Sequence, residues 1–331
     1  MKKQIIASII LLIVSAIWGL AFVFQDIAGS YLPSFSVSAS RFLFASIALL
    51  PLVLYKHLHK KDTNEHEVKK ENKFFSKELL IGGLISGTLL SLGSILQQYG
   101  LQFHSVGKTG FITTSYILII PIISLFFKKY CSWNTYVAVV SAMGGVFLLC
   151  TDGGIHFNWT DLILFGSAIA YALQIMCVNH LVNTKEVDPV DLSFIQLVYT
   201  FLISSVLALI FDTSKGVKWD DFVNALPSLL YIGVISAALG YTLQNVTQKY
   251  IPETLAGLIM SLESVFSLIF GVIILKQYMN GFEIAGCVVM FASVIFAQLP
   301  IIEWLKKRKQ TKEFTKSEIN KQETNNNYSK N

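Results

Sequence analysis

Ten apolar runs, each close to the length that crosses a lipid bilayer, divide this 331-residue sequence. A transmembrane helix needs about 20 predominantly apolar residues, because the hydrocarbon layer is about 30 Å thick. Only 14% of the residues are charged, whereas soluble domains carry about 25%. The sequence therefore predicts an all-α integral membrane protein with ten transmembrane helices, near residues 4–25, 33–55, 79–102, 106–127, 134–151, 160–183, 190–211, 224–248, 254–275 and 281–300.

The start, the longest link and the end of the sequence each need a separate interpretation. The first apolar run has membrane-spanning length, and no small-residue cleavage site follows it, so we interpret it as an uncleaved helix rather than a signal peptide. Residues 56–78 are rich in Lys, Glu, His and Asn, which indicates a solvated loop. Residues 303–331 are charged and basic, so we expect a disordered tail that buries no core.

Basic residues outside the predicted helices lie mostly on one side of the membrane. If the N-terminus is cytoplasmic, 21 of the 26 Lys and Arg residues fall in cytoplasmic segments. Only four, Lys108, Lys215, Lys218 and Lys276, fall on the outer side. Lys and Arg are enriched in cytoplasmic loops of membrane proteins. We therefore expect both termini, the 56–78 loop and the tail to be cytoplasmic.

A long stretch of the sequence occurs twice. Residues 92–143 recur as residues 239–290 at a constant offset of 147, without a gap. LGSILQ returns as LGYTLQ, and Gly110 falls on Gly257. Identities at Leu or Ile are common in apolar helices, so the glycine and glutamine matches carry the signal. Self-similarity of this kind predicts an internal structural repeat.

The repeat unit contains five predicted helices, which is an odd number. The second copy must therefore cross the membrane in the opposite sense to the first. We predict two inverted five-helix repeats, residues 1–151 and 160–300. Inverted repeats related by an axis in the membrane plane are typical of secondary transporters, which alternate between two conformations around a central site.

The sequence carries no signature of an enzyme, an ATP-driven pump or a metal site. It contains neither G-x-x-x-x-G-K-[ST] nor H-E-x-x-H. Its four cysteines are scattered without a C-x-x-C pair. Its basic residues lie in loops and the tail rather than between stacking aromatics on a helix face. We therefore predict no enzymatic activity, no cofactor, no metal and no nucleic-acid partner.

Two ionisable residues lie inside predicted helices, where a charge needs a partner or a water-filled cavity. Glu263 lies near the middle of the ninth helix, and the offset of 147 pairs it with Tyr116 near the midplane. Desolvation favours a neutral carboxyl, so Glu263 is either a site that gains and loses a coupled proton or a structural acid bonded to a neighbouring Ser or Thr. Arg41, in the outer half of the second helix, either contacts solute or snorkels and pairs near the outer face.

Uncharged polar and aromatic residues inside the helices give further candidates. Gln97 pairs with Gln244 in the repeat, and Asn245 follows directly. Such amides either join helices or contact a solute. Trp18 and Tyr171 form either an aromatic wall of a cavity or buried packing. Pro121 removes one backbone hydrogen bond, which predicts a kink near the site.

Several segments resemble a known family. These are SAIWGLAFVFQ (15–25), RFLFASIALLP (41–51), LQQYGLQFHSVGKTGFITTSYILIIPIISLFFKK (96–129), GYTLQNVTQKYIPETLAGLIMSLESVFSLIFGVIIL (240–275) and AQLP (297–300). Together they resemble bacterial EamA-type carriers of the drug/metabolite transporter superfamily, over roughly residues 1–303. The resemblance implies ten helices in two inverted EamA repeats, a cavity lined by helices 1–4 and 6–9, and peripheral helices 5 and 10.

The sequence departs from the family after the ninth helix. Relatives carry Gly-Glu there, whereas this chain has Lys276 and Gln277. A base therefore stands near the outer helix end where the family has an acid, so a family role for that acid in capping or gating does not transfer.

The resemblance implies a secondary transporter in a bacterial cytoplasmic membrane. It would move a small metabolite, an amino-acid-like compound or a drug by alternating access, as an exporter. Its partners would be the solute and the lipid bilayer, and a homodimer is compatible with it. A coupled proton would be a further partner if Glu263 gains and loses one during transport. The alternative is a membrane protein that binds a ligand or lipid without transport, as a sensor or scaffold.

Overall fold

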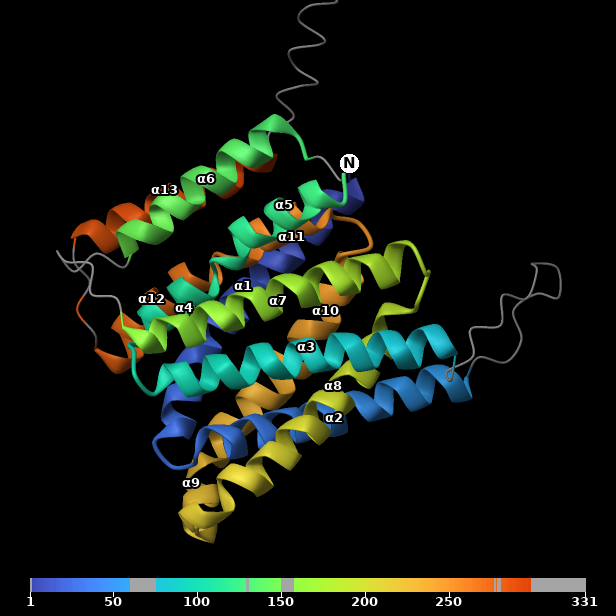
Figure 1. The fold of residues 1–331 in the computed structure, drawn as a ribbon, viewed down its shortest axis with the longest axis vertical. Coiled ribbons are helices and arrows are strands. Elements are labelled where there is room, and N and C mark those ends of the chain that lie inside the picture. The colour runs from blue at the N-terminus through green and yellow to red at the C-terminus, as the bar shows by residue number, and fades with distance from the viewer. Residues whose placement is uncertain are drawn as a thin grey trace, which may run out of the picture.

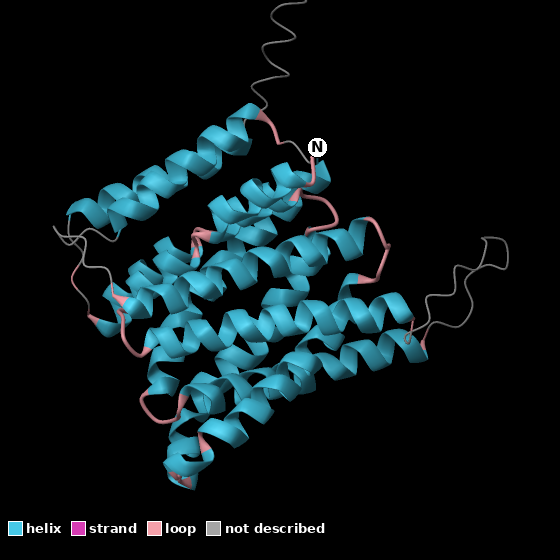
Figure 2. Cartoon of the chain, in the orientation of Figure 1, coloured by secondary structure: helices cyan, strands magenta, loops and turns pink. Residues whose placement is uncertain are grey.

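The fold is that of a computed structural model, which describes residues 2–59, 76–128, 131–149, 158–276, 278 and 281–298. Every regular element in these ranges is a helix (Figure 2). Most of the 56–78 loop, all of the 303–331 tail and Gln277 lie outside the described residues.

Ten helical spans cross the molecule side by side (Figure 1). Seven are single helices: α1 (Lys2–Gly29), α2 (Ser34–Leu58), α3 (Lys77–Leu101), α6 (Trp133–Leu149), α7 (Trp159–Asn183), α8 (Pro189–Phe211) and α13 (Gly281–Gln298). Three are interrupted: α4 (Val106–Thr113) with α5 (Tyr116–Phe126), α9 (Trp219–Leu230) with π-helix η2 (Tyr231–Leu239) and α10 (Gly240–Thr247), and α11 (Glu253–Met260) with α12 (Glu263–Leu275). A short 3₁₀ turn, η1 (Thr213–Lys215), links α8 and α9.

The prediction of an all-α membrane protein with ten spans is confirmed. Eight of the described spans are long and apolar enough to cross a bilayer, and two shorter apolar helices, within α6 and α13, complete the set. Successive spans alternate in direction, so α1 begins on the same face of the bundle as α7 ends. We call this face the N-terminal face.

Two of the interrupted spans break at positions related by the repeat offset. The first breaks at Thr114 and Ser115, and the second breaks at Ser261 and Leu262, which lie 147 residues later. Their backbone bonds correspond as well: the Ser115 amide donates to the Ile112 carbonyl at 3.1 Å, and the Leu262 amide donates to the Ile259 carbonyl at 3.2 Å. The repeat seen in the sequence is thus a repeat in three dimensions.

Hydroxyl side chains explain both breaks better than proline does. The Thr114 hydroxyl donates to the Phe111 carbonyl at 2.8 Å, and the Ser261 hydroxyl donates to the Leu258 carbonyl at the same distance. Such bonds compete with backbone bonds and bend helices. Pro121 lies within α5, beyond the break, so the break is a separate feature and the kink at this proline stays a prediction.

Two repeat glycines let aromatic rings approach the backbone. A Cβ atom on Gly93 of α3 would lie 3.1 Å from the ring of Tyr171 on α7. A Cβ atom on Gly240 of α10 would lie 2.6 Å from Nε1 of Trp18 on α1. Each glycine thus receives a ring from the first helix of the other repeat. This exchange holds the two repeats together around the bundle centre.

Helices α6 and α13 form a pair at the edge of the bundle (Figure 1). They are the fifth span of each repeat and pack mainly against each other. A Cβ atom on Gly145 of α6 would lie 2.8 Å from the Gly286 carbonyl of α13, so these backbones are close. Small residues permit such close packing in membranes.

An ion-pair cluster ties α2 to α8 at the N-terminal face. Lys56 Nζ lies 2.5 Å from Asp188 Oδ1 and 3.1 Å from Asp191 Oδ1. Asp188 also caps α8 by accepting from the backbone amides of Val190 and Asp191. Burial alone would raise the pKa of Asp188, but the hydrogen bonds from Lys56 and these amides hold that pKa below its ordinary value.

Lys276 ends α12 in a left-handed conformation, with φ of 54°. Its backbone amide donates to the Gly271 carbonyl, which closes the helix end. A non-glycine residue in this conformation costs about 1–2 kcal/mol, and glycine is the usual residue at such a position. The backbone conformation at position 276 would therefore favour the glycine that the family has there, although this chain has lysine.

Gly19 and Gly144 offer a matched test of helix packing. A Cβ atom on Gly19 would lie 2.3 Å from Cβ of Phe266 and 2.8 Å from the α12 backbone, whereas one on Gly144 would meet nothing within 4 Å. We expect Gly19→Ala to lower the free energy of unfolding by about 1–3 kcal/mol, because α1 and α12 must separate. We expect Gly144→Ala to raise it by about 0.5–1 kcal/mol. Unfolding of both variants in detergent measures this, and a Gly19→Ala variant as stable as wild type would contradict the α1–α12 contact.

Candidate functional site

A polar cavity lies at the centre of the bundle, where the interrupted spans meet. Seven of the eight residues proposed from the sequence line it. The lining consists of Trp18, Ala21, Phe22, Gln25, Arg41, Gln97, Tyr116, Tyr171, Gln174, Ile175, Ser236, Tyr241, Gln244 and Glu263. These residues come from seven of the ten spans, and α6, α8 and α13 contribute none.

Glu263 and Tyr116 contact each other in this cavity. The Tyr116 hydroxyl donates to Glu263 Oε1 at 3.1 Å, and both side chains are about 95% buried or more. The two residues are 147 positions apart, so each is the repeat counterpart of the other. Counterparts can touch only if both lie close to the axis that relates the repeats. The structural alternative for Glu263 was a bond to Ser or Thr, but in the structure the carboxyl accepts from the phenol of Tyr116.

Arg41 lies in the cavity rather than at the outer face. Its side chain is only 4% exposed. Nη1 donates to Gln25 Oε1 and Nη2 donates to Ser236 Oγ, both at 3.1 Å. The guanidinium carbon also lies 5.4 Å from the ring centroid of Phe42. The snorkelling interpretation is therefore not the one that the structure adopts.

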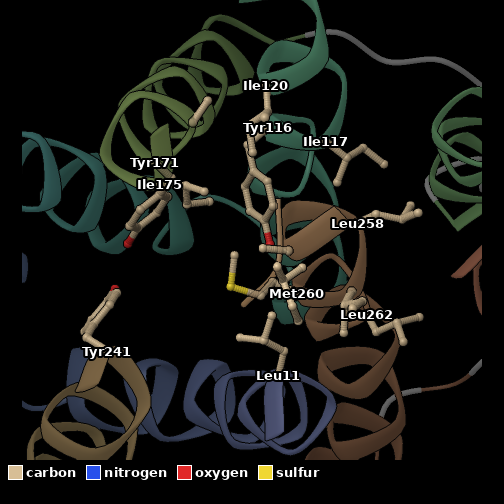
Figure 3. Packing of buried hydrophobic residues seen from close by; sticks show 14 of the residues in the cluster. Leu11, Tyr116, Ile117, Ile120, Tyr171, Ile175, Tyr241, Leu258, Met260 and Leu262 are labelled. Carbon is tan, nitrogen blue, oxygen red and sulfur yellow. The ribbon is translucent and has the colours of Figure 1, made fainter. Parts of the chain in front are cut away.

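Aromatic rings form a wall of the cavity. Trp18 and Tyr241 pack with ring centroids 5.1 Å apart, and Trp18 Nε1 donates to the Ser236 carbonyl at 3.0 Å. Figure 3 shows the hydroxyls of Tyr171 and Tyr241 pointing toward one another from α7 and α10, with Tyr116 beside them. Trp18 and Tyr171 thus line the cavity as predicted, together with a third aromatic residue, Tyr241.

The amides of the repeat have different roles. Gln97 accepts from the Tyr171 hydroxyl at 3.3 Å, and Gln244 donates to Gln174 Oε1 at 3.3 Å, so both contact α7 from the cavity wall. Asn245 donates to Ser193 Oγ of α8 at 2.9 Å and does not line the cavity. Of the two alternatives for Asn245, the helix-joining one describes its position.

Four further polar residues line the site that the sequence did not single out: Gln25, Gln174, Ser236 and Tyr241. Helical spacing offered a signal for two of them. Gln25 lies seven residues after Trp18, and Gln174 lies three residues after Tyr171, so each shares a face with a proposed residue. Ser236 lies in the π-helical stretch, where the α-helical spacing used to assign faces does not hold.

The cavity has little free space, and most of its lining side chains are buried. Near the N-terminal face, Asn179 and Asn183 of α7 donate to the Gln248 carbonyl at 3.3 and 3.0 Å. Near the opposite face, Gln98 of α3 donates to the Gln25 carbonyl of α1 at 3.2 Å. These hydrogen bonds join neighbouring spans on both sides of the cavity.

Comparison with protein families identifies the fold and the class of function. The model of the EamA-like transporter family matches residues 5–151 and 158–299. This chain belongs to that family. The transporter interpretation is therefore confirmed: it is a multi-pass membrane protein that transports small molecules. The alternative of a sensor or scaffold without transport is not supported.

Relatives of this EamA-like transporter cover most of its length. An uncharacterized transporter of Archaeoglobus fulgidus is 26% identical over 300 residues, covering 90% of this chain and 88% of the relative. A protein of Rickettsia felis named S-adenosylmethionine uptake transporter is 25% identical over 269 residues, covering 81% of this chain and 84% of the relative. A solved crystal structure matches 88% of this chain and 95% of its own with a TM-score of 0.69. Because its identity is 14%, that likeness shows the fold alone.

A double-mutant cycle tests the Tyr116–Glu263 contact. Tyr116→Phe removes the donor, Glu263→Gln replaces the acceptor, and the double variant removes both partners. Because the two changes act on one bond, we expect their effects on unfolding to depart from additivity by about 0.6–1.7 kcal/mol, the size of interhelical hydrogen bonds in bilayers. Unfolding of all four proteins in the same detergent measures this. Strict additivity would mean that the two side chains do not interact.

Proposed function

We propose that this EamA-like transporter is a secondary carrier that works by alternating access, and that Glu263 carries a coupled proton. The cargo would be a small metabolite, an amino-acid-like compound or a drug, moved outward. The membrane would be a bacterial cytoplasmic membrane, with both termini in the cytoplasm. Two further predictions accompany this proposal. They are the repeat boundaries, at residues 1–151 and 160–300, and a homodimeric assembly.

The position of Glu263 carries this proposal. A site on the axis between two repeats keeps its place when the repeats rock against each other, so it can face each side of the membrane in turn. Within the described residues, the Tyr116 hydroxyl is the one hydrogen-bond donor to the carboxyl. A phenol can donate to a carboxylate and can accept from a protonated carboxyl, so this contact tolerates both forms of Glu263. An acid that can change its protonation state on the axis is suited to exchange a proton for a solute.

Glu263→Gln separates proton coupling from structure, since the amide keeps the shape and cannot titrate. With S-adenosylmethionine as the first solute in proteoliposomes, an imposed pH gradient should accelerate flux through the wild type. Glu263→Gln should fold, retain solute-for-solute exchange and lose this acceleration. Glu78→Gln, an exposed acid on α3 outside the cavity, should behave like wild type. Acceleration that persists in Glu263→Gln would remove the coupling role.

The names of the Rickettsia relatives favour a second candidate, the uptake of S-adenosylmethionine. Three such relatives are 24–25% identical over 81% of this chain. Labelled S-adenosylmethionine distinguishes the two directions: accumulation by intact expressing cells supports uptake, and faster release from preloaded cells supports export. A metabolite comparison of deletion and overexpression strains tests other cargoes.

The proposed orientation is tested with one cysteine on each face. In a chain whose four native cysteines are replaced by serine, Tyr278→Cys should react with a membrane-impermeant thiol reagent added to intact cells. Lys185→Cys should react only after the cells are opened. Both positions are exposed and lie in links on opposite faces, Lys185 between α7 and α8 and Tyr278 between α12 and α13. Labelling of Lys185→Cys in intact cells would reverse the orientation.

A further inference from the structure

We propose that the guanidinium of Arg41 binds the carboxylate of a zwitterionic solute whose cationic group faces Glu263. This inference rests on the proposed function, because it names the substrate class for the same cavity. It is carried by the contacts and the charge balance around Arg41.

The protein supplies Arg41 with neutral partners only. In the described part of the chain, the guanidinium donates to Gln25 and Ser236, and it forms no ion pair. Its Nε atom is buried without a hydrogen-bond partner. A buried cation without a directly paired anion is costly. An anionic group in the cavity would remove this cost.

The local charge favours a carboxylate over a phosphate. One guanidinium supplies one positive charge, which a carboxylate balances. A phosphate dianion would leave an excess negative charge in a cavity that also contains the acidic side chain of Glu263. Guanidinium and carboxylate match as planar, bidentate partners. The Nε–H group, which the protein leaves unused, is one of the donors available for such a pair.

The Arg41 head group is held in a fixed direction. Gln25 comes from α1 and Ser236 comes from η2, so the guanidinium is bound from two different spans while its own helix is α2. The Phe42 ring lies within cation–π distance of it. A pre-positioned donor loses little rotamer freedom on binding, which increases affinity.

The part of the cavity around Glu263 suits a cationic group. Glu263 accepts one hydrogen bond from Tyr116 and retains further acceptor capacity. Trp18, Tyr171 and Tyr241 supply aromatic faces and hydroxyls to the same cavity, and aromatic faces attract ammonium groups. A solute with a carboxylate and an ammonium group would therefore satisfy both ionisable residues at once.

Arginine itself is unusual in this protein. Of its 26 basic residues only Arg41 and Arg308 are arginine, and the rest are lysine. Arginine differs from lysine in presenting a planar fork of donors. The use of this residue inside the bundle agrees with a role in bidentate recognition, which a lysine would not perform.

Ligand-dependent stability of the full chain in detergent tests the proposal without requiring transport. The probes are a mixture of natural L-amino acids and a matched mixture of their α-amides, which keep the ammonium group and lose the carboxylate. We expect the amino acids to raise the unfolding temperature of the wild type. Since a hydrogen bond to a charged group is worth about ten- to a hundredfold in affinity, the amides should bind more weakly by that factor.

Variants assign this preference to Arg41. Arg41→Gln should lose the preference for amino acids over amides, Arg41→Lys should keep part of it, and Glu78→Gln should keep all of it. If Arg41→Gln does not fold, Arg308→Lys offers a second route, since it leaves Arg41 as the sole target of phenylglyoxal. Amino acids should then slow modification of Arg41, followed by peptide mass spectrometry, and amides should not.

Two results would overturn the inference. One is equal stabilisation by amides and amino acids, and the other is no stabilisation and no protection by the amino acids. Solute flux in proteoliposomes is measured separately. Flux that survives in Arg41→Gln with unchanged solute preference would leave the carrier function standing and remove the carboxylate site.

Discussion

The contact between Tyr116 and Glu263 constrains the rest of this structure. Each residue begins the second half of an interrupted span, and each is the counterpart of the other in the repeat. Two counterparts that touch must lie beside the axis that relates the repeats, so the breaks in both spans meet at the bundle centre. The central cavity follows from this arrangement, because interrupted helices leave polar groups that only a polar cavity can accommodate in a membrane.

The scaffold is nearly symmetric, but the lining of the cavity is not. The π-helical stretch Tyr231–Leu239 in the eighth span differs from the third span, where α3 is a regular α-helix throughout Lys77–Leu101. Ser236, which contacts both Trp18 and Arg41, lies in this π-helical stretch. A symmetric scaffold can provide two facing states from similar packing, whereas an asymmetric lining can hold a solute whose two ends differ.

The sequence predicted the spans and the repeat well, because membrane thickness sets helix length and the offset is independent of packing. It also paired Glu263 with Tyr116 as counterparts near the midplane, but it did not predict that the two side chains touch. It could not assign neighbours to Arg41, whose partners Gln25 and Ser236 come from spans that are distant in sequence. Asn245 shares its segment with Gln244 but lies one position away on the helix, about 100° around the axis, and so it faces α8 instead. It did not predict the two breaks, at which the Thr114 and Ser261 hydroxyls donate to carbonyls of the preceding turn.

The energetics of the closed cavity connect binding with movement. Arg41 Nε, Gln174 Nε2 and Gln244 Oε1 are buried without hydrogen-bond partners, and each such group costs about 1–3 kcal/mol when it is left unsatisfied. A solute that bonds to these atoms removes the cost only when the helices are closed around it, because open helices expose the same atoms to water. Solute binding therefore stabilises the closed arrangement relative to the open ones. If the arrangement closed around the cavity is favourable only when solute is bound, the carrier rarely changes from one facing state to the other without solute. Coupled transport requires this.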